Sequence, residues 1–403
     1  RKQDFIKFYF IITKDFFLKL FLAILLIRRF FMKQEKYIGH SSQISGVEEY
    51  RCLNGKSDGM HVLHIRNGLG MELMINADRC ADISRLSLDG KNLSYTSVVG
   101  NVAPDYFSID SDGFGFLKSF NCGFITTCGF DNIGNPNEDE GTLYGLHGNV
   151  GNIPAEYIYH TEDATSIEVH AIIKDHAIFG KKFTLHRTYV ISKTENTFAL
   201  HDKIVNEGSA PSPLMYMYHM NIGYPLLTEN SEFYINSYEV VPRDEEAKKG
   251  LAQWNQMIPP TPNFAEQCFY HHYHTDLAKM MVYNKDIEKG IQICFDTKEF
   301  PQNLQWKMMG ERDYVLGLEP CTADLDGRHT IKKNSEILTL EPAESKDFSV
   351  NVHLFNDKFQ FFNLSSLIQK KVDFNQLFIY HKRRQLLCQQ LKKYLKPEKE
   401  FYS

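Results

Sequence analysis

Alternation of apolar and polar residues along short segments is the feature of this sequence that most limits its fold. Apolar side chains recur at alternate positions in Phe183, Leu185 and Tyr189, in Ile291, Ile293 and Phe295, and in Phe348, Val350, Val352 and Leu354. A period of two residues is typical of a strand with one buried side and one wet side. Asp89-Gly90, Asn206-Glu207-Gly208 and Asp326-Gly327 mark turns between such segments.

Many short strands with frequent turns predict an all-β fold in which antiparallel sheets pack as a sandwich. No linker divides Val62 from Phe355, so we expect one large domain over residues 32–356. The 403 residues, 43% of them hydrophobic, suffice for a sizeable core. A net charge of −5 lacks the basic excess that a nucleic-acid groove needs, so no nucleic-acid partner is expected.

The two ends of the chain differ from the rest. Residues 1–31 are apolar but broken by charges, and the longest charge-free run, Leu20 to Ile27, is too short to span a bilayer. We expect a dispensable extension there rather than a weak membrane anchor. Residues 357–403 form a basic tail in which residues 385–395 fit an amphipathic helix, either a docking helix or an appended stretch.

The eight cysteines form no CxxC pair and match no zinc spacing. Free, buried thiols in a reducing compartment explain them, which predicts a cytoplasmic protein.

Two apolar segments each end in a polar, titratable residue. His219 lies in Tyr218-His219-Met220-Asn221-Ile222-Gly223-Tyr224-Pro225, and Glu319 ends the run Val315-Leu316-Gly317-Leu318 before Pro320. Such strand ends present polar side chains at a rim. We expect His219 and Glu319 to meet across one pocket as an acid and base pair.

Other polar residues leave two interpretations open. Arg79, between Asp78 and Asp82, is suited either to a ligand hydroxyl or to a structural ion pair. His147, next to Gly148, is either a residue of the binding site or an ordinary surface histidine. Trp306 is either a ring on which a sugar stacks or a core residue.

A metal site is the weaker interpretation of the segment His271-His272-Tyr273-His274. His272 and His274 would share one face of a strand, but no acidic residue at fitting spacing completes a ligand set. No metal is therefore expected.

The order of these motifs resembles the aldose 1-epimerase-like family known as domain of unknown function 4432, over roughly Val47 to Phe355. The resemblance rests on five motifs: Asp78-Arg79 with Asp82-Ile83, Gly123 with Thr127-Cys128-Gly129, Leu146-His147-Gly148, His219 with Asn221 and Gly223-Tyr224-Pro225, and Gly317-Leu318-Glu319-Pro320. It implies the β-supersandwich that this family shares with galactose mutarotases.

The resemblance also implies an activity, the interconversion of the anomers of an aldose without a cofactor. His219 falls at the general acid and Glu319 at the general base, and we then expect a hollow between them that a pyranose ring can fill, with their pKa values pushed apart. Arg79 and His147 fall at contacts to substrate hydroxyls. Further substrate contacts are implied for Asn132, Asn221, Arg243 and Trp306. A non-catalytic sugar-binding protein and another sugar isomerase, or a metal-assisted enzyme using His272 and His274, remain alternatives, because one fold hosts several chemistries.

Overall fold

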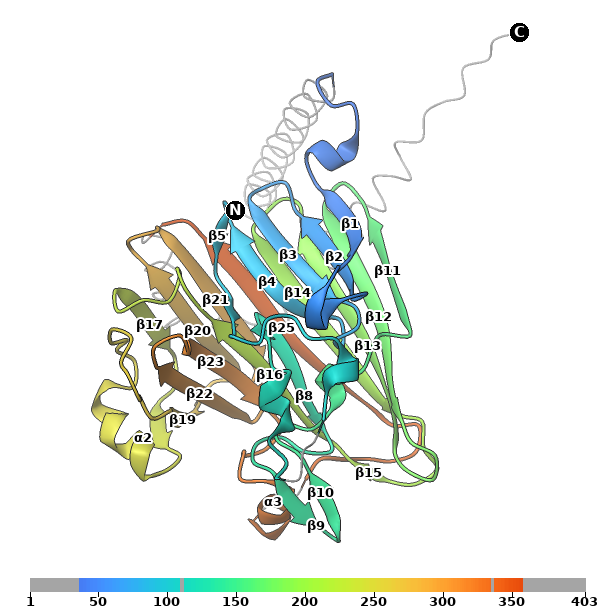
Figure 1. Cartoon of the computed structure of the whole chain (residues 1–403), viewed down its shortest axis with the longest axis vertical. Coiled ribbons are helices and arrows are strands. Elements are labelled where there is room, and N and C mark those ends of the chain that lie inside the picture. Colours follow the sequence, from blue (N-terminus) through green and yellow to red (C-terminus); the bar gives the residue numbers. More distant parts are fainter. Residues whose placement is uncertain (1–35, 109–111, 335–336, 358–403) are drawn as a thin grey trace, which may run out of the picture.

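The computed structural model describes residues 36–108, 112–334 and 337–357 (Figure 1). Residues 1–31 and the basic tail beyond residue 357, with its predicted helix, lie outside these ranges. The predicted all-β architecture is confirmed, and every strand pair in the described ranges that forms a ladder is antiparallel.

Three large sheets make up the molecule. The first has the order β1 (Gly46–Arg51), β2 (His61–Arg66), β3 (Met71–Asn76), β4 (Asp82–Leu88), β5 (Lys91–Asn92). The second has the order β11 (Tyr157–Glu162), β12 (Ser166–His176), β13 (Lys182–Ser192), β14 (Thr197–Asn206), β25 (Ser345–Phe355), β21 (Lys289–Asp296), β20 (Leu277–Asn284), β17 (Ser231–Ile235). The third has the order β18 (Glu239–Pro242), β19 (Gln267–His272), β22 (Gln302–Met309), β23 (Tyr314–Cys321), β16 (Met215–Ile222), β8 (Ile125–Phe130).

Smaller elements connect the sheets. Short ladders join β6 (Tyr95–Thr96) to β7 (Cys122–Gly123), β9 (Asn137–Asp139) to β10 (Thr142–Tyr144), and β15 (Ser212–Pro213) to β24 (Thr339–Leu340). The described α-helices are α2 (Glu245–Gly250) and α3 (Arg328–Asn334). Single 3-10 turns are η1 (Ser41–Gln43), η2 (Gly55–Ser57), η3 (Pro104–Tyr106), η4 (Gly115–Lys118), η5 (Val150–Asn152) and η6 (Leu251–Gln253).

The five-stranded and six-stranded sheets lie across the eight-stranded sheet (Figure 1), and one apolar core joins all three. The alternating segments behave as predicted. In β13, Phe183, Leu185 and Tyr189 are buried while His186 is exposed. The first strand, β1, was not predicted, because its outer half, Glu49 to Arg51, is exposed and carries no apolar alternation.

Strand β16 is buried along its whole length, so both of its faces contact protein. Tyr216 and Tyr218 belong to the main core, whereas Met215 and Met217 belong to a second apolar cluster on the opposite face of the six-stranded sheet. The strand therefore divides the molecule into a core side and an outer side.

A buried ion cluster crosses the core side. Arg187 of β13 donates from Nε to Asp202 Oδ1 at 3.0 Å and from Nη2 to Asp202 Oδ2 at 2.7 Å. Its Nη1 donates to Asp82 Oδ1 at 2.5 Å and to the Cys80 carbonyl at 2.8 Å. Asp202 lies in β14 and Asp82 in β4, so one guanidinium joins two sheets.

Hydroxyl groups extend this cluster to the third sheet. Tyr216 and Tyr218 of β16 each donate to Asp202 Oδ2 at 2.6 Å. Thr127 of β8 donates to Asp82 through its hydroxyl at 2.5 Å and through its backbone N–H at 2.7 Å. A buried carboxylate loses its hydrogen bonds to water, so it is stable only where protein groups replace them, as they do here.

Two further features bear on the sequence predictions. The seven cysteines that the structure describes are free, and five of them are buried. Across the described ranges no helix combines the length and apolar character needed to cross a membrane.

We expect Arg187→Met to lower the free energy of unfolding by about 3–5 kcal/mol, because it leaves two buried carboxyl groups without their cation. Denaturant unfolding followed by circular dichroism measures this change. Arg85→Met, at an exposed position of β4, is the matched control and should change stability by less than about 0.5 kcal/mol. Equal unfolding midpoints for the two variants would contradict the structural role of the cluster.

Candidate active site

The two residues predicted to form an acid and base pair lie opposite each other in the six-stranded sheet. Met217 pairs with Cys321 and Met220 with Leu318, so the antiparallel register brings His219 of β16 beside Glu319 of β23. His219 Nε2 lies 3.3 Å from Glu319 Oε1. Both side chains project from the outer side of the sheet, the side that also carries Met215 and Met217.

The predicted position at a rim is wrong. His219 is 3% exposed and Glu319 is 1% exposed, because β16 continues to Ile222 and β23 to Cys321. The predicted gap for a pyranose ring is also wrong, since 3.3 Å between the two side chains leaves no room for a ring between them.

Aromatic rings surround the imidazole of His219 edge-on. The ring centroids of Phe120, Trp306 and His147 lie 5.0, 5.3 and 5.5 Å from that of His219. Phe116, in turn, lies 5.1 Å from His147. Phe116 belongs to η4 and Phe120 follows it, so one segment covers both histidines. Sequence reasoning did not single out either phenylalanine.

Burial dominates the electrostatics of the pair. It lowers the pKa of His219 to about 3, against a smaller opposing effect of Asn221. It raises the pKa of Glu319 to about 8, and Glu266 acts in the same direction while Arg243 opposes it. The expectation that the two pKa values separate agrees with these directions. At pH 7, however, the closed pair consists of a neutral imidazole and a protonated carboxyl group, not of an imidazolium and a carboxylate.

His147 has a fixed tautomer. The backbone N–H of Gly134 donates to His147 Nδ1 at 3.2 Å, so Nδ1 carries a lone pair. Burial first, then His219 and Arg243, hold the pKa of His147 well below its usual range. A neutral ring with Nδ1 as acceptor carries its proton on Nε2, which makes Nε2–H a hydrogen-bond donor.

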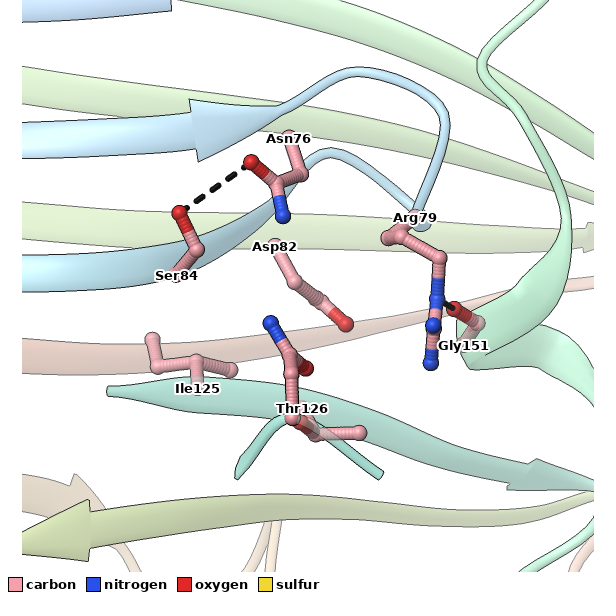
Figure 2. Close-up of a pocket in the computed structure, with 8 residues that line it drawn as sticks. Asn76, Arg79, Asp82, Ser84, Ile125, Thr126 and Gly151 are labelled. Carbon is pink, nitrogen blue, oxygen red and sulfur yellow. Dashed lines mark hydrogen bonds between the residues drawn. The ribbon is translucent and has the colours of Figure 1, made fainter. Parts of the chain in front are cut away.

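The buried Arg79 makes its hydrogen bonds to backbone carbonyls. Its Nε donates to the Gly151 carbonyl at 2.8 Å, and its Nη1 donates to the carbonyls of Val102 and Ser119 at 2.7 and 3.1 Å. Figure 2 shows this side chain beside a small hollow, which does not admit a water molecule. Arg79 thus fixes the backbone at Ser119, the residue before Phe120. Among the described residues it forms no ion pair with Asp78 or Asp82, the structural alternative considered for it.

The two predicted asparagines differ. The Asn132 amide is saturated: Nδ2 donates to the carbonyls of Asn135 and Gly145, and Oδ1 accepts from Asn137 and from the Arg328 N–H. Asn221 lies two residues after His219 on the same face of β16, and its Nδ2 donates to the His219 carbonyl at 2.9 Å. Its Oδ1 is buried and has no hydrogen-bond partner among the described residues, and the same holds for His219 Nδ1 and Glu319 Oε1.

Arg243 and Trp306 lie on the other flank of the pair. The Trp306 indole donates to Glu266 Oε2 at 2.8 Å. Arg243 contacts Asn135 Oδ1 at 3.4 Å and Cys268 Sγ at 3.7 Å. Gly317 separates Trp306 from Glu319, because a Cβ at this position would lie 2.7 Å from Glu319 Oε1 and 3.0 Å from Trp306 Cβ.

His272 and His274, the residues considered as metal ligands, do not form part of a ligand set in the described structure. His274 stacks on Tyr238 with ring centroids 3.5 Å apart, and His272 lies at 6.5 Å from the same ring. Within the ranges that the structure describes, no three His, Cys, Asp or Glu side chains gather closely enough to hold a metal ion.

Comparisons with known proteins show the family and the fold. The sequence model of a family described as a domain of unknown function (DUF4432) matches residues 57–354. No curated protein matches the sequence.

Solved structures with the same fold include a candidate aldose 1-epimerase from Klebsiella pneumoniae, with 27% identity and a TM-score of 0.76 over 82% of this chain and 88% of that one. A galactose mutarotase-like protein from Clostridium acetobutylicum has 14% identity and a TM-score of 0.56 over 78% and 99%. A galactose 1-epimerase from Lactobacillus acidophilus has 12% identity and a TM-score of 0.50 over 78% and 99%. The predicted galactose mutarotase-like fold is confirmed.

We expect Gly317→Ala to push the Glu319 carboxyl group and the Trp306 ring apart, because the new methyl group would occupy the space between them. Overpacking of this kind lowers the free energy of unfolding by about 1–3 kcal/mol, and it should shift the tryptophan fluorescence maximum. Gly39→Ala is the control, since its Cβ would meet nothing closer than Gln43 Oε1 at 3.6 Å. An unchanged spectrum and stability for Gly317→Ala would show that the packing there is loose.

Proposed function

Since this chain belongs to the family described as a domain of unknown function (DUF4432), we propose that it is a cofactor-independent aldose 1-epimerase, which interconverts the α and β anomers of a cyclic sugar. The observation that carries the proposal is the buried His219–Glu319 pair, in which a nitrogen and a carboxyl oxygen lie 3.3 Å apart beneath aromatic rings.

The reaction needs one group that accepts a proton and one that donates a proton. The base removes the proton from the anomeric hydroxyl while the acid protonates the ring oxygen, and the bond between C1 and the ring oxygen breaks. The open-chain aldehyde rotates about its C1–C2 bond, and the ring closes on the other face by the reverse transfers. No electrons are gained or lost, and the enzyme ends with the protons it began with.

The short distance between His219 and Glu319 suits this chemistry. The anomeric oxygen and the ring oxygen are bonded to the same carbon, so they lie closer together than two hydrogen-bonded atoms. One edge of the sugar can therefore present both oxygens to adjacent acid and base groups. A ring between the two side chains, as first expected, is not required.

The proton must be redistributed for Glu319 to act as base. The free pair carries its proton on Glu319, whose pKa burial raises to about 8. Transfer of that proton across the 3.3 Å to His219 Nε2 yields the carboxylate and imidazolium that ring opening uses. Polar hydroxyls of a bound sugar favour this ionic form, because they replace part of the solvation that burial removes.

Neighbouring groups have supporting roles in the proposal. His147 offers an Nε2–H donor for a sugar hydroxyl, and Trp306 offers an aromatic face. Asn221 donates to the His219 carbonyl and so helps to hold the backbone that carries the imidazole. Because Phe116 and Phe120 cover the histidines, the sugar reaches the pair only when their segment moves aside.

We expect Glu319→Gln and His219→Asn to fold normally and to lose catalysed anomer exchange by at least about 100-fold, because each removes one proton-transfer group. Polarimetry and exchange NMR against a panel of aldoses measure the rates. His274→Asn and Glu239→Gln, at exposed positions, are matched controls. Wild-type rates in both site variants would refute the assignment, and sugar binding without turnover by the unmodified protein would favour a non-catalytic sugar-binding protein.

The pH dependence follows from the proton held by the pair. Activity requires one proton shared between His219 and Glu319, and that state exists between pH about 3 and about 8. As the pH rises through about 8 the pair loses this proton, so kcat/KM should stay level to that point and then fall about tenfold per pH unit. A midpoint at the ordinary histidine pKa of about 6.5 would show that burial does not set the pKa values of the pair.

A further inference from the structure

Arg243 differs from the other buried or half-buried arginines in what its guanidinium contacts. Arg187 binds two carboxylates, Arg328 binds Asp139 at 3.0 Å, and Arg79 binds three backbone carbonyls. The half-buried Arg243 contacts only a side-chain amide oxygen at 3.4 Å and a thiol at 3.7 Å. The distance to oxygen is long for a charged donor, which normally binds oxygen at about 2.7–2.9 Å, and a thiol is only a weak acceptor.

Two carboxylates whose charges act on Arg243, Asp244 and Glu266, have other hydrogen-bond partners. Asp244 Oδ1 accepts from the Ala247 N–H and so caps α2. Glu266 Oε2 accepts from the Trp306 indole. Among the described residues, no carboxylate lies within ion-pair distance of Arg243. Burial alone would disfavour the charged form of Arg243, but neighbouring groups, Glu266 and Asp244 among them, raise its pKa, so the guanidinium stays charged. Its N–H groups still lack a carboxylate hydrogen-bond partner, which a ligand could supply.

Arg243 lies next to the six-stranded sheet that carries His219 and Glu319. It follows β18, and its backbone N–H donates to the Cys268 carbonyl at 2.9 Å. Cys268 pairs with Trp306, which in turn pairs with Gly317, so one row across the sheet runs from Arg243 to the strand of Glu319. On the loop side, Arg243 contacts Asn135, the neighbour of Gly134, whose N–H orients His147.

The guanidinium also lies at the boundary between the interior and solvent, because Cys268 is buried and Asn135 is exposed. Its charge acts on two groups of the site. The pKa of His147 is lowered first by burial, then by His219 and by Arg243. The pKa of Glu319 is raised by burial and by Glu266, and Arg243 lowers it. A sugar whose anomeric edge contacts the pair would therefore extend toward this cation.

We propose that Arg243 binds an anionic substituent of the sugar, a carboxylate or a phosphate, so that the preferred substrate is an acidic or phosphorylated aldose rather than a neutral one. The proposal rests on the function proposed above, because it places the sugar at the His219–Glu319 pair. The planar guanidinium can hold either anion through two parallel hydrogen bonds.

The test compares matched sugars. Exchange NMR gives kcat/KM for glucose, glucuronate and glucose 6-phosphate, and for the corresponding galactose series, after subtraction of the uncatalysed rate. We expect the unmodified protein to prefer either the uronates or the phosphates over the neutral sugars by about 10- to 100-fold, the value of one charged hydrogen-bonding contact. Which of the two anions is preferred identifies the source of the charge.

The variants separate a charge contact from a structural role. Arg243→Gln should reduce the ratio of anionic to neutral kcat/KM to near one, whereas Arg243→Lys should retain part of it. Arg85→Gln, on the exposed side of β4, removes the same charge elsewhere and should leave the ratio unchanged. A ratio near one in the unmodified protein, or a ratio that Arg243→Gln leaves intact, would overturn the inference.

The failure of this inference is distinguishable from failure of the proposed function. Catalysed exchange of neutral sugars, with no preference for anions, refutes only the role of Arg243. If no sugar is turned over, titration calorimetry with the same sugars decides the inference by binding: it holds if anionic sugars bind at least about 10-fold more tightly than neutral ones and Arg243→Gln removes the difference, and it fails otherwise.

Discussion

The ion cluster around Arg187 is the interaction on which the rest of the structure depends. Its guanidinium binds Asp202 in the eight-stranded sheet and Asp82 in the five-stranded sheet, and Asp202 accepts from Tyr216 and Tyr218 in the six-stranded sheet. The two tyrosines lie on the core side of β16. Because alternate residues of a strand face opposite ways, their anchoring directs His219 to the outer side. The position of the imidazole is thus set by hydrogen bonds made on the opposite face of the same strand.

Burial then gives the pair its chemistry. His219 and Glu319 occur within strands, so the flanking strands and the aromatic segment remove water from both. An imidazole and a carboxyl group in such surroundings prefer their neutral forms, so below pH about 8 Glu319 keeps its proton while His219 stays neutral. The same surroundings make proton transfer to a bound sugar electrostatically effective, since no bulk water screens the charges that develop.

Much of this fold could be predicted from the sequence, because alternation is a local signal: the segments around Phe183, Ile291 and Phe348 all proved to be strands. The pair itself was visible as polar residues in apolar runs. Its depth was not, because the sequence of one strand does not show how far its neighbours extend. The role of Arg79 was equally hidden, since the carbonyls it binds lie 72 and 40 residues away in the chain. The partners of Asn132 are nearer, but irregular loop segments give no periodic signal that would show them. Phe116 and Phe120 resembled ordinary core residues, and only the assembled structure shows that they lie against the histidines.

The closed aromatic cover has an energetic consequence for any ligand of this site. Exposing Phe116 and Phe120 to water would cost about 1.5–3 kcal/mol for each ring, so an open form with both rings in water would be populated to well under 1% of the closed form. A sugar that bound only this rare form would lose affinity in the same proportion. The cost falls if the rings exchange their contacts with His147 and His219 for contacts with the apolar face of the sugar. An aromatic cover therefore favours ligands that offer both an apolar face and a polar edge, and a pyranose ring has both.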